Sequence, residues 1–329
     1  MSKTLYMVVP CYNEQEVLPE TSKRLLEKLQ SLVLKNKIAD NSRIMFVNDG
    51  SKDQTWSMIK GLCEENSVFA GVNLSRNRGH QNALLAGMAT AVKYADMIVT
   101  MDADLQDPPM LLPEMLRIIR EEQYDSVATR RVTRKGEPPI RSFCARQFYH
   151  IMNKISDVEL MDGARDYRFM TRKYVNAVLS LKEFNRFSKG IFGWVGFRTK
   201  WLEFENQERS AGETKWSFWK LVQYSLQGIV SFSETPLYMA SVLGGGMCGV
   251  ALLAIIFIIV RQLLFGGSAF GWPSMACIVI LIGGIQLLSI GILGLYFSKM
   301  YLEIKHRPIY IMSETCIELE RKEKTDEIM

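Results

Sequence analysis

The chain of 329 residues is poor in the residues that build zinc sites and disulfide frameworks: it has six cysteines without a CxxC pair and only three histidines. Zinc fingers and disulfide-stapled secreted domains need closely spaced cysteines, so both classes are excluded and the thiols are interpreted as reduced packing residues. The net charge of +5 is modest and no segment resembles an RNA- or DNA-binding module, so no nucleic acid partner is expected.

Two further signals are missing from the beginning of the chain. The apolar stretch there covers only residues 5–10 and leads directly into a polar turn, which excludes a secretory signal peptide and predicts a cytoplasmic N-terminal region. No GxGxxG run follows this stretch, and the first glycine-containing turn is not a Walker loop. A nicotinamide enzyme and a P-loop NTPase are therefore disfavoured.

Charged residues are also absent from two long stretches near the C-terminal end, 235–260 and 262–298. Residues 237–260 and 273–298 are each long enough to cross the roughly 30 Å hydrocarbon core of a bilayer as a helix. Two such lengths in tandem disfavour the alternative, a buried hairpin in a soluble protein. The flanking basic residues are Arg209, Lys215, Lys220, Lys299, Lys305 and Arg307. By the positive-inside rule, both termini are expected in the cytoplasm, in a multi-pass protein of the inner (plasma) membrane.

Ahead of these stretches, short apolar runs alternate with longer helical patterns, as is typical of an α/β fold with a largely parallel sheet. The expected strands are residues 5–9, 43–47, 71–74 and 97–101, with a strand-like run at 126–129, and the expected helices are 16–34, 52–65 and 81–94. Polar turns follow three of the strands, at 11–14, 48–51 and 102–106. Because ligands of open α/β sheets gather at the carboxyl ends of strands, the three turns predict a nucleotide site.

The acidic turn after the fourth strand is the most informative of the three. Asp102 and Asp104 can hold one Mg²⁺ or Mn²⁺ ion against a diphosphate, and Gln106 adds a neutral oxygen ligand. In the other turns, Asp49 can accept a hydrogen bond from a base N–H and Tyr12 can pack on the base or ribose. A single loop aspartate is more often a solvated cap, so the prediction depends on the combination of turns.

The segments around these turns resemble the family 2 glycosyltransferases of the GT-A fold. The matching runs are VVPCYNE at 8–14, VNDGS at 47–51, SRNRG at 75–79 and DADLQDP at 102–108. Other runs resemble the polyprenyl-phosphate glycosyltransferases, which include the bactoprenol glucosyltransferases and, more distantly, dolichyl-phosphate mannose synthase. These runs are DYRFM at 166–170, ERSAGETK at 208–215, GGIQ at 283–286 and HRPIY at 306–310.

The resemblance implies inverting transfer of a sugar from a nucleotide sugar to a polyprenyl monophosphate on the cytoplasmic leaflet. UDP-glucose and undecaprenyl phosphate are the expected pair, although an N-acetylhexosamine, mannose or aminoarabinose donor would use the same motifs. The implied nucleotide-sugar residues are Pro10, Tyr12, Glu14, Asp49 and Asp102, and the implied metal ligands are Asp102, Asp104 and Gln106. A homo-oligomer is also implied, with a tetramer as the first candidate.

The acceptor phosphate has a second pKa of about 6, so it is already a nucleophile at neutral pH, and the larger problem is to bring it to a donor diphosphate. The basic stretch 130–146 is a candidate clamp for it, with Arg130 and Arg141 foremost; a solvated basic loop and a lipid-headgroup patch are the alternatives. Arg209 and Lys215 form a second candidate set. The expected catalytic group is Asp104, Asp166, Arg130 and Arg209.

Asp166 is implied to act on the acceptor side, as a base or as an orienting group for Arg168, a further phosphate-binding candidate. Because a base is dispensable, orientation or binding of a sugar hydroxyl is slightly favoured. Three positions depart from the family pattern. Arg165 stands where a small residue is expected, His80 where a lysine is common, and Leu295 where a glutamate is common. A single histidine at a helix start is more often a cap or surface residue than a catalyst, and this is the interpretation favoured for His80.

The expected organisation is a catalytic domain over 1–210, amphipathic surface helices over 211–234, a transmembrane hairpin over 235–300 and a cytoplasmic tail over 301–329 that frays after Ser313. Two other functions stay open. A processive polysaccharide synthase would need more spans and a QxxRW motif, and neither is present. A membrane-tethered nucleotide-sugar sensor without turnover would be expected to lack Asp102 and Asp104, which are both present.

Overall fold

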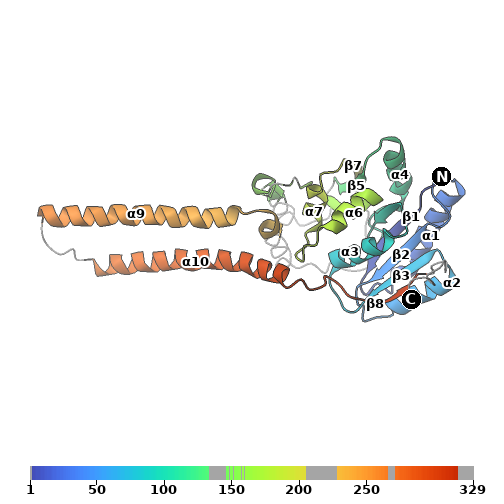
Figure 1. The fold of residues 1–329 in the computed structure, drawn as a ribbon, viewed down its shortest axis with the longest axis horizontal. Helices are drawn as coiled ribbons and strands as arrows, with labels where there is room; N and C mark the ends of the chain where they lie inside the picture. Colours follow the sequence, from blue (N-terminus) through green and yellow to red (C-terminus); the bar gives the residue numbers. More distant parts are fainter. Residues whose placement is uncertain are drawn as a thin grey trace, which may run out of the picture.

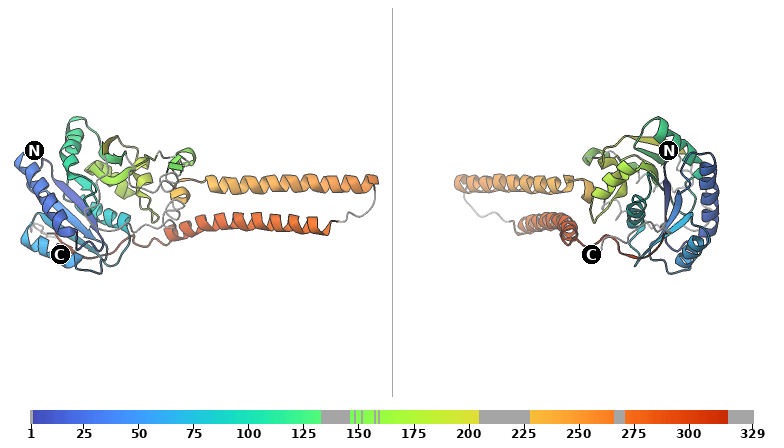
Figure 2. Two further views of the ribbon diagram at one scale, coloured as in Figure 1. Left: turned by 180° about the vertical axis from the view of Figure 1, so that it is seen from behind. Right: turned by 45° about the vertical axis from the view of Figure 1, so that its right-hand side comes forward.

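The computed structural model describes residues 2–132, 146–147, 149–150, 152–156, 158, 160–204, 228–265 and 271–317. An α/β domain forms one end of the molecule. Two long helices, α9 (Thr235–Phe265) and α10 (Trp272–Ile304), project from it side by side as a hairpin (Figures 1 and 2). Of the expected surface helices at 211–234, residues 211–227 lie outside the described residues, as do residues 318–329 of the expected tail at 301–329.

Eight strands of the described chain form one mixed sheet in the order β7-β5-β6-β4-β1-β2-β3-β8. Its parallel centre consists of β1 (Leu5–Cys11), β2 (Arg43–Asn48), β3 (Phe69–Leu74) and β4 (Met97–Thr100). The remaining strands are β5 (Ser126–Arg131), β6 (Ala164–Thr171), β7 (Thr199–Phe204) and β8 (Met312–Cys316). Strand β6 runs antiparallel to both β4 and β5, so the fourth strand has a neighbour whose direction the sequence analysis did not anticipate.

Helices cover both faces of this sheet and explain why its central strands are apolar throughout. On one face lie α1 (Leu18–Leu34), α2 (Thr55–Glu65) and α4 (Leu112–Glu121), which follows a short 3-10 turn, η1 (Pro109–Leu111). On the other lie α3 (His80–Ala91), α6 (Arg172–Ser180) and α7 (Ser188–Trp194). Along β1, Leu5 and Met7 pack on the first face while Tyr6 and Val8 pack on the second. A strand buried on both faces shows no alternation of polar and apolar residues.

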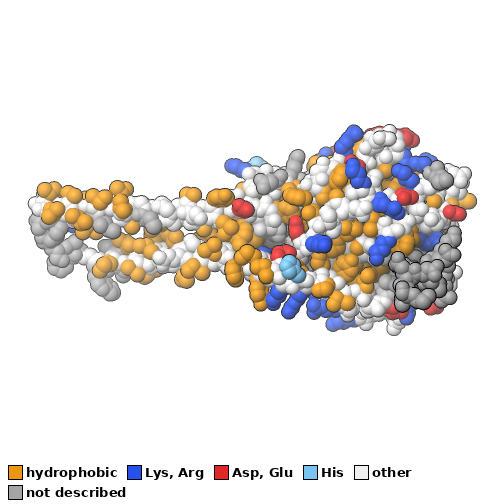
Figure 3. All heavy atoms as spheres, in the orientation of Figure 1, with side chains coloured by type: hydrophobic (Ala, Val, Ile, Leu, Met, Phe, Trp, Pro, Cys, Tyr) orange, Lys and Arg blue, Asp and Glu red, His pale blue; other side chains and the backbone are white. Residues whose placement is uncertain are grey.

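The fold class expected from the sequence is confirmed: an α/β domain is followed by two long apolar helices. The predicted strands and helices of the first hundred residues are all present, with boundaries that differ by a few residues. Within the described chain, 235–261 and 278–304 are long and apolar enough to cross a membrane. In the space-filling view, hydrophobic side chains lie along the hairpin, whereas charged side chains gather on the domain (Figure 3).

The expectation that the chain frays after Ser313 is wrong for residues 313–316, which belong to β8. This strand runs antiparallel to β3 and supplies the backbone partners that an edge strand otherwise lacks. Its Glu314 side chain accepts hydrogen bonds from Trp56 Nε1 at 2.9 Å and Lys60 Nζ at 3.2 Å. The chain therefore returns to the domain after the hairpin, and the charged residue Glu314 forms specific contacts there.

The base of the hairpin is fixed to the domain by hydrogen bonds. The Glu303 carboxylate of α10 accepts the backbone N–H groups of Phe184 at 2.9 Å and Asn185 at 3.1 Å. One turn earlier, Lys299 Nζ donates to Asn185 Oδ1 at 3.1 Å. Tyr296 OH donates to the carbonyl of Ser233, just before α9, at 2.6 Å. Both ends of the hairpin are thereby held on the same side of the domain.

The contact between α3 and the sheet depends on Gly87. A Cβ added there would lie 2.8 Å from Cγ2 of Val47 and closer still to Cγ1 of Val8. We predict that Gly87→Ala destabilises the domain by about 1–3 kcal/mol, because the overpacked helix must move away from the strands. The matched control is Gly61→Ala in α2, where nothing lies within 4 Å and a stabilisation of about 0.8 kcal/mol is expected. Thermal unfolding in detergent measures both changes; equal midpoints for the two variants would contradict this packing.

Candidate active site

The acidic turn after β4 meets β6 and the start of α3 at the carboxyl edge of the parallel strands. His80, the first residue of α3, has its Nε2 atom 3.4 Å from Asp102 Oδ1 and 3.4 Å from Asp166 Oδ2. The hydroxyl of Thr100, the last residue of β4, donates to the backbone carbonyl of Asp166 at 2.6 Å. His80 therefore links the turn that carries the predicted metal ligands to the strand that carries the predicted acceptor-side carboxylate.

The charges in this contact stabilise one another. Desolvation lowers the pKa of His80, whose side chain is 42% exposed, but the neighbouring carboxylates of Asp102 and Asp166 outweigh this effect and raise the pKa to about 9. Burial raises the pKa of Asp166, but its hydrogen bond to His80 and the charges of His80, Lys189 and Arg165 hold the value at about 2. At neutral pH the pair is an imidazolium and a carboxylate. A carboxylate with so low a pKa is a weak proton acceptor.

Arg165 binds the acidic turn from the side of β6. Its guanidinium donates from Nε to Asp107 Oδ1 at 3.3 Å and from Nη2 to Gln106 Oε1 at 3.2 Å. Its Nη2 atom also lies 3.8 Å from Asp102 Oδ2. Asp107 is completely buried, and burial together with the charge of Asp102 raises its pKa to about 7 despite Arg165. The departure from the family pattern at Arg165 thus supplies the cation that holds this turn against the sheet.

The sequence analysis missed two members of this site. Asp107 was part of the quoted motif but received no role, and His80 was interpreted as a cap or surface residue. His80 does lie exposed at the start of α3, as that interpretation expects, but its side chain also contacts two carboxylates. We use the name carboxylate cluster for Asp102, Asp104, Asp107 and Asp166. The signal available in the sequence was a basic residue at 80 and an additional arginine at 165, together with an unusually acidic turn.

The acidic turn fits a metal ion that shares its ligands with a bound phosphate. Among the described residues, no group of three or more His, Cys, Asp or Glu side chains could hold a metal by itself. Asp102 Oδ1 is nevertheless buried and accepts no hydrogen bond, with His80 Nε2 as its charged neighbour at 3.4 Å, and Asp104 lies on the same turn. Mg²⁺ is commonly bound by one or two carboxylates together with phosphate oxygens and water. Asp102 and Asp104 therefore suit a cation whose coordination a diphosphate would complete.

The predicted nucleotide turns lie beside the acidic turn and are tied to one another. Asp49 is 2% exposed, and its carboxylate accepts the backbone N–H groups of Arg78 at 2.7 Å and Gly79 at 2.8 Å. The backbone N–H of Asn13 donates to Ser51 Oγ at 3.0 Å. Asp49 therefore shapes the turn after β3. The sequence analysis predicted only a contact between Asp49 and a base, and not this structural role.

Pro10, Tyr12 and Glu14 follow the same edge at the end of β1. Pro10 pairs in register with Val47 of β2, and the backbone N–H of Glu14 donates to Thr55 Oγ1 at 3.0 Å. Pro10 is buried, whereas Tyr12 and Glu14 are partly exposed. The structure thus brings all four predicted nucleotide residues outside the acidic turn to the expected edge of the sheet.

The residues that were predicted to bind the acceptor phosphate do not all lie at this edge of the sheet. Arg130 pairs with Glu203, with Nε 3.1 Å from Oε1. Arg168 is 3% exposed, and its Nη1 atom donates to Ser126 Oγ at 3.2 Å and to Tyr174 OH at 3.3 Å. Its guanidinium also lies 4.4 Å from the centre of the Phe192 ring. The orienting partner of Asp166 in this structure is thus His80 rather than Arg168.

Three other predicted residues, Arg141, Arg209 and Lys215, lie outside the described residues. Leu295 of α10, the third departure from the family pattern, is 54% exposed on the hairpin.

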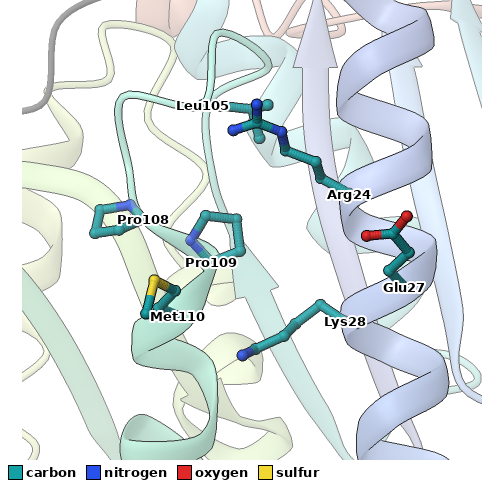
Figure 4. A pocket seen from close by; sticks show the side chains of 7 residues that line it. All are labelled: Arg24, Glu27, Lys28, Leu105, Pro108, Pro109 and Met110. Atoms are coloured by element: carbon teal, nitrogen blue, oxygen red, sulfur yellow. The ribbon is translucent and has the colours of Figure 1, made fainter.

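A pocket of about 310 Å³ lies on the outer side of the acidic turn, between that turn and α1 (Figure 4). Its lining residues are Arg24, Glu27, Lys28, Leu105, Pro108, Pro109 and Met110. Leu105 has a positive φ of 55° and lines this pocket, whereas its neighbours Asp104 and Gln106 do not. The pocket is therefore separate from the carboxylate cluster.

The role of Asp49 can be tested by nucleotide binding. We predict that Asp49→Ala weakens the binding of uridine diphosphate at least about tenfold, because two charge-assisted hydrogen bonds that shape the turn at 76–79 are lost. The matched control is Asp96→Ala, which removes a carboxylate that accepts the Thr4 N–H at the opposite edge of the sheet. Calorimetric titration measures both affinities. Similar affinities for the two variants would contradict this role of Asp49.

Comparison with known proteins agrees with this architecture. Residues 6–179 match glycosyl transferase family 2. A putative glycosyltransferase of Bacillus subtilis is 39% identical over 98% of this chain and 95% of its own. A prophage bactoprenol glucosyl transferase homolog of Escherichia coli is 36% identical over 93% of this chain and 97% of its own, and the bactoprenol glucosyl transferase of Shigella phage SfV gives the same values.

A solved structure of glucosyl-3-phosphoglycerate synthase from Mycobacterium tuberculosis, in complex with Mn²⁺, UDP-glucose and phosphoglyceric acid, is similar with a TM-score of 0.44. It is 16% identical and covers 69% of this chain and 78% of its own. The family assignment comes from the sequence relatives, since the match extends over 6–179 and the relatives cover nearly the whole chain. This protein belongs to glycosyltransferase family 2.

Proposed function

We propose that this glycosyltransferase moves a sugar, with inversion, from a nucleotide sugar to a polyprenyl monophosphate at the cytoplasmic face of a membrane. The observation that carries the proposal is the position of His80, which lies 3.4 Å from both Asp102 and Asp166. A diphosphate on the acidic turn and an acceptor phosphate beside Asp166 would meet there. The relatives from Escherichia coli and Shigella phage SfV, named for bactoprenol glucosyl transfer, support this acceptor class.

On the donor side, Asp102 and Asp104 would hold Mg²⁺ or Mn²⁺, with Gln106 as a neutral oxygen ligand. When bound, the metal supplies positive charge to the leaving diphosphate. Arg165 keeps the turn in place through Gln106 and Asp107, so the metal ligands are ordered before the donor binds. Preorganised charge of this kind costs no rearrangement at the moment of reaction.

On the acceptor side, a phosphate oxygen would attack the anomeric carbon while the bond from that carbon to the diphosphate oxygen breaks. The electron pair of the broken bond leaves with the nucleoside diphosphate. The attacking phosphate, with a second pKa of about 6, has no proton to lose at neutral pH. The pKa of about 2 for Asp166 agrees with a group that orients His80 and the acceptor, and not with a general base.

The arrangement of the hairpin supports placing the site at a membrane surface with both termini on its cytoplasmic side. Tyr296 contacts the chain just before α9, and Glu303 contacts the domain at Phe184 and Asn185. The chain that enters the hairpin and the chain that leaves it thus lie on one side. A lipid phosphate held at that side would need to travel only from the headgroup layer to Asp166.

We propose UDP-glucose as the donor and undecaprenyl phosphate as the acceptor, and membranes containing the protein provide the test. A panel of UDP-glucose, UDP-N-acetylglucosamine, GDP-mannose and UDP-aminoarabinose is incubated with undecaprenyl phosphate, and the lipid products are identified by mass spectrometry. Addition of one hexose from UDP-glucose is expected. Failure to form a lipid-linked sugar from any donor would overturn the proposed function and favour a sensor without turnover.

The metal ligands are tested separately. Asp102→Ala and Asp104→Ala are each predicted to lower transfer at least about 100-fold, because the charge that stabilises the leaving diphosphate is lost. Chelation by EDTA is expected to stop the wild-type reaction, and added Mg²⁺ or Mn²⁺ to restore it. Asp40→Ala, an exchange of an exposed residue between α1 and β2, serves as the control. Undiminished transfer by both acidic-turn variants would reject the mechanism.

A further inference from the structure

Two of the six cysteines meet where the chain returns to the domain after the hairpin. Cys63 lies near the end of α2, and Cys316 is the last residue of β8. They are 253 positions apart in the sequence, yet their Sγ atoms are 2.9 Å apart and share a hydrogen bond. Both residues are free thiols and are partly exposed. The interpretation of the thiols as packing residues does not account for such a pair.

The thiols end a row of contacts between β8 and α2. Glu314 and Cys316 lie on the same face of β8, because alternate residues of a strand point to one face. The Glu314 carboxylate accepts hydrogen bonds from Trp56 and Lys60 of α2. Trp56, Lys60 and Cys63 are spaced by four and three residues, so they share one face of that helix. The strand and the helix thus meet through matched side chains, and the two sulfur atoms are the last of them.

A glycine on β3 provides the space for the Cys316 thiol. Strand β8, drawn in red, lies beside β3 in Figure 1, and Cys316 pairs in register with Gly71. A Cβ added to Gly71 would lie 2.5 Å from Cys316 Sγ and 2.7 Å from Cγ2 of Ile59 in α2. The thiol therefore occupies the space that a side chain at position 71 would need, between β3 and α2.

The two thiols differ in acidity. Their hydrogen bond lowers the pKa of Cys316, although burial opposes this, and it raises the pKa of Cys63 together with burial. Cys316 is therefore the better nucleophile of the two, because a thiolate and not a thiol attacks a disulfide. A disulfide bond is about 2.05 Å long, so the sulfur atoms need to approach by less than about 1 Å to form one.

We propose that Cys63 and Cys316 are a redox-active pair whose oxidation to an intrachain disulfide fastens β8 to α2. The inference goes beyond the proposed function and does not depend on sugar transfer. In reducing surroundings such a bond forms transiently, as in proteins that sense oxidants.

The oxidant is a low-molecular-weight disulfide. The Cys316 thiolate attacks one of its sulfur atoms, and the other sulfur leaves as a thiolate. The Cys63 thiol then gives its proton to solvent and attacks Cys316 Sγ in the mixed disulfide, which releases the second small thiolate. Two protein thiols are oxidised, and one small disulfide is reduced to two thiols.

The new bond would also hold chain that supports the predicted nucleotide edge. Just before β8, the carbonyl of Ile311 accepts the backbone N–H of Ser75 at 2.9 Å, and the carbonyl of Pro308 accepts the guanidinium of Arg78 at 3.0 Å. The backbone N–H of Arg78 binds the Asp49 carboxylate. A disulfide at the end of β8 therefore fixes a segment that contacts the turn after β3.

Disulfide mapping of the purified full-length protein tests the pairing. The protein is treated with oxidised glutathione, free thiols are alkylated, and peptides are identified by mass spectrometry with and without dithiothreitol. A peptide pair joined through Cys63 and Cys316 is expected, and dithiothreitol should release it. In Cys63→Ser, Cys316 is expected to carry glutathione instead, because the second thiol is missing; should this variant fail to fold, Cys316→Ser replaces it, with glutathione expected on Cys63. Absence of the joined pair from folded, oxidised wild-type protein would overturn the proposal.

Hydrogen exchange measures whether the bond fastens β8. Amide exchange in 69–74 and 312–316 is predicted to slow at least about tenfold when the wild-type protein is oxidised, because β8 can then separate from β3 only together with α2. The same treatment of the serine variant should not slow exchange there. Equal rates in reduced and cross-linked wild-type protein would reject the fastening role. Neither measurement requires sugar transfer, so failure of this proposal is distinguishable from failure of the proposed function.

Discussion

Repulsion among four carboxylates at one edge of the sheet is the constraint on which the rest of the site depends. Asp102, Asp104 and Asp107 lie on a single turn, and Asp166 lies on the adjacent strand. Two cations compensate them: His80 at the start of α3 and Arg165 on β6. Like charges at a partly buried site are tolerated only when opposite charges are held close by. The cluster therefore fixes the positions of α3 and β6 as well as those of the ligands.

The sequence predicted the parallel half of the fold because its strands are buried on both faces and are apolar without interruption, as in β1. It could not predict β8, because the exposed residues Ser313 and Glu314 are polar or charged, as residues of an unstructured tail commonly are. They form a strand only by pairing with β3. Likewise, the sequence could not show that the exposed His80 contacts Asp166, because the two residues are remote in the sequence. This contact depends on the antiparallel pairing of β4 with β6, which cannot be predicted from a local sequence pattern.

The hairpin is integrated into the catalytic domain instead of being a simple anchor. Glu303 binds the loop before α7, Phe232 packs on Gly190, and β8 completes the sheet after the chain has left α10. Arg78, whose backbone N–H binds Asp49, also donates from its guanidinium to the carbonyl of Pro308 at 3.0 Å. The turn beside the predicted nucleotide site thus contacts the chain that follows α10, and the loop before α7 contacts α10 itself.

The central claim is a direct attack by the lipid phosphate on the sugar of the nucleotide donor, without a covalent enzyme intermediate. The anomeric configuration of the lipid-linked product tests it most directly, and NMR coupling constants of the product made from an α-linked nucleotide sugar provide it. A single displacement inverts the anomeric carbon, so the β-linked sugar phosphate is predicted. A product that retains the α-configuration would contradict the attack geometry derived from Asp102, His80 and Asp166.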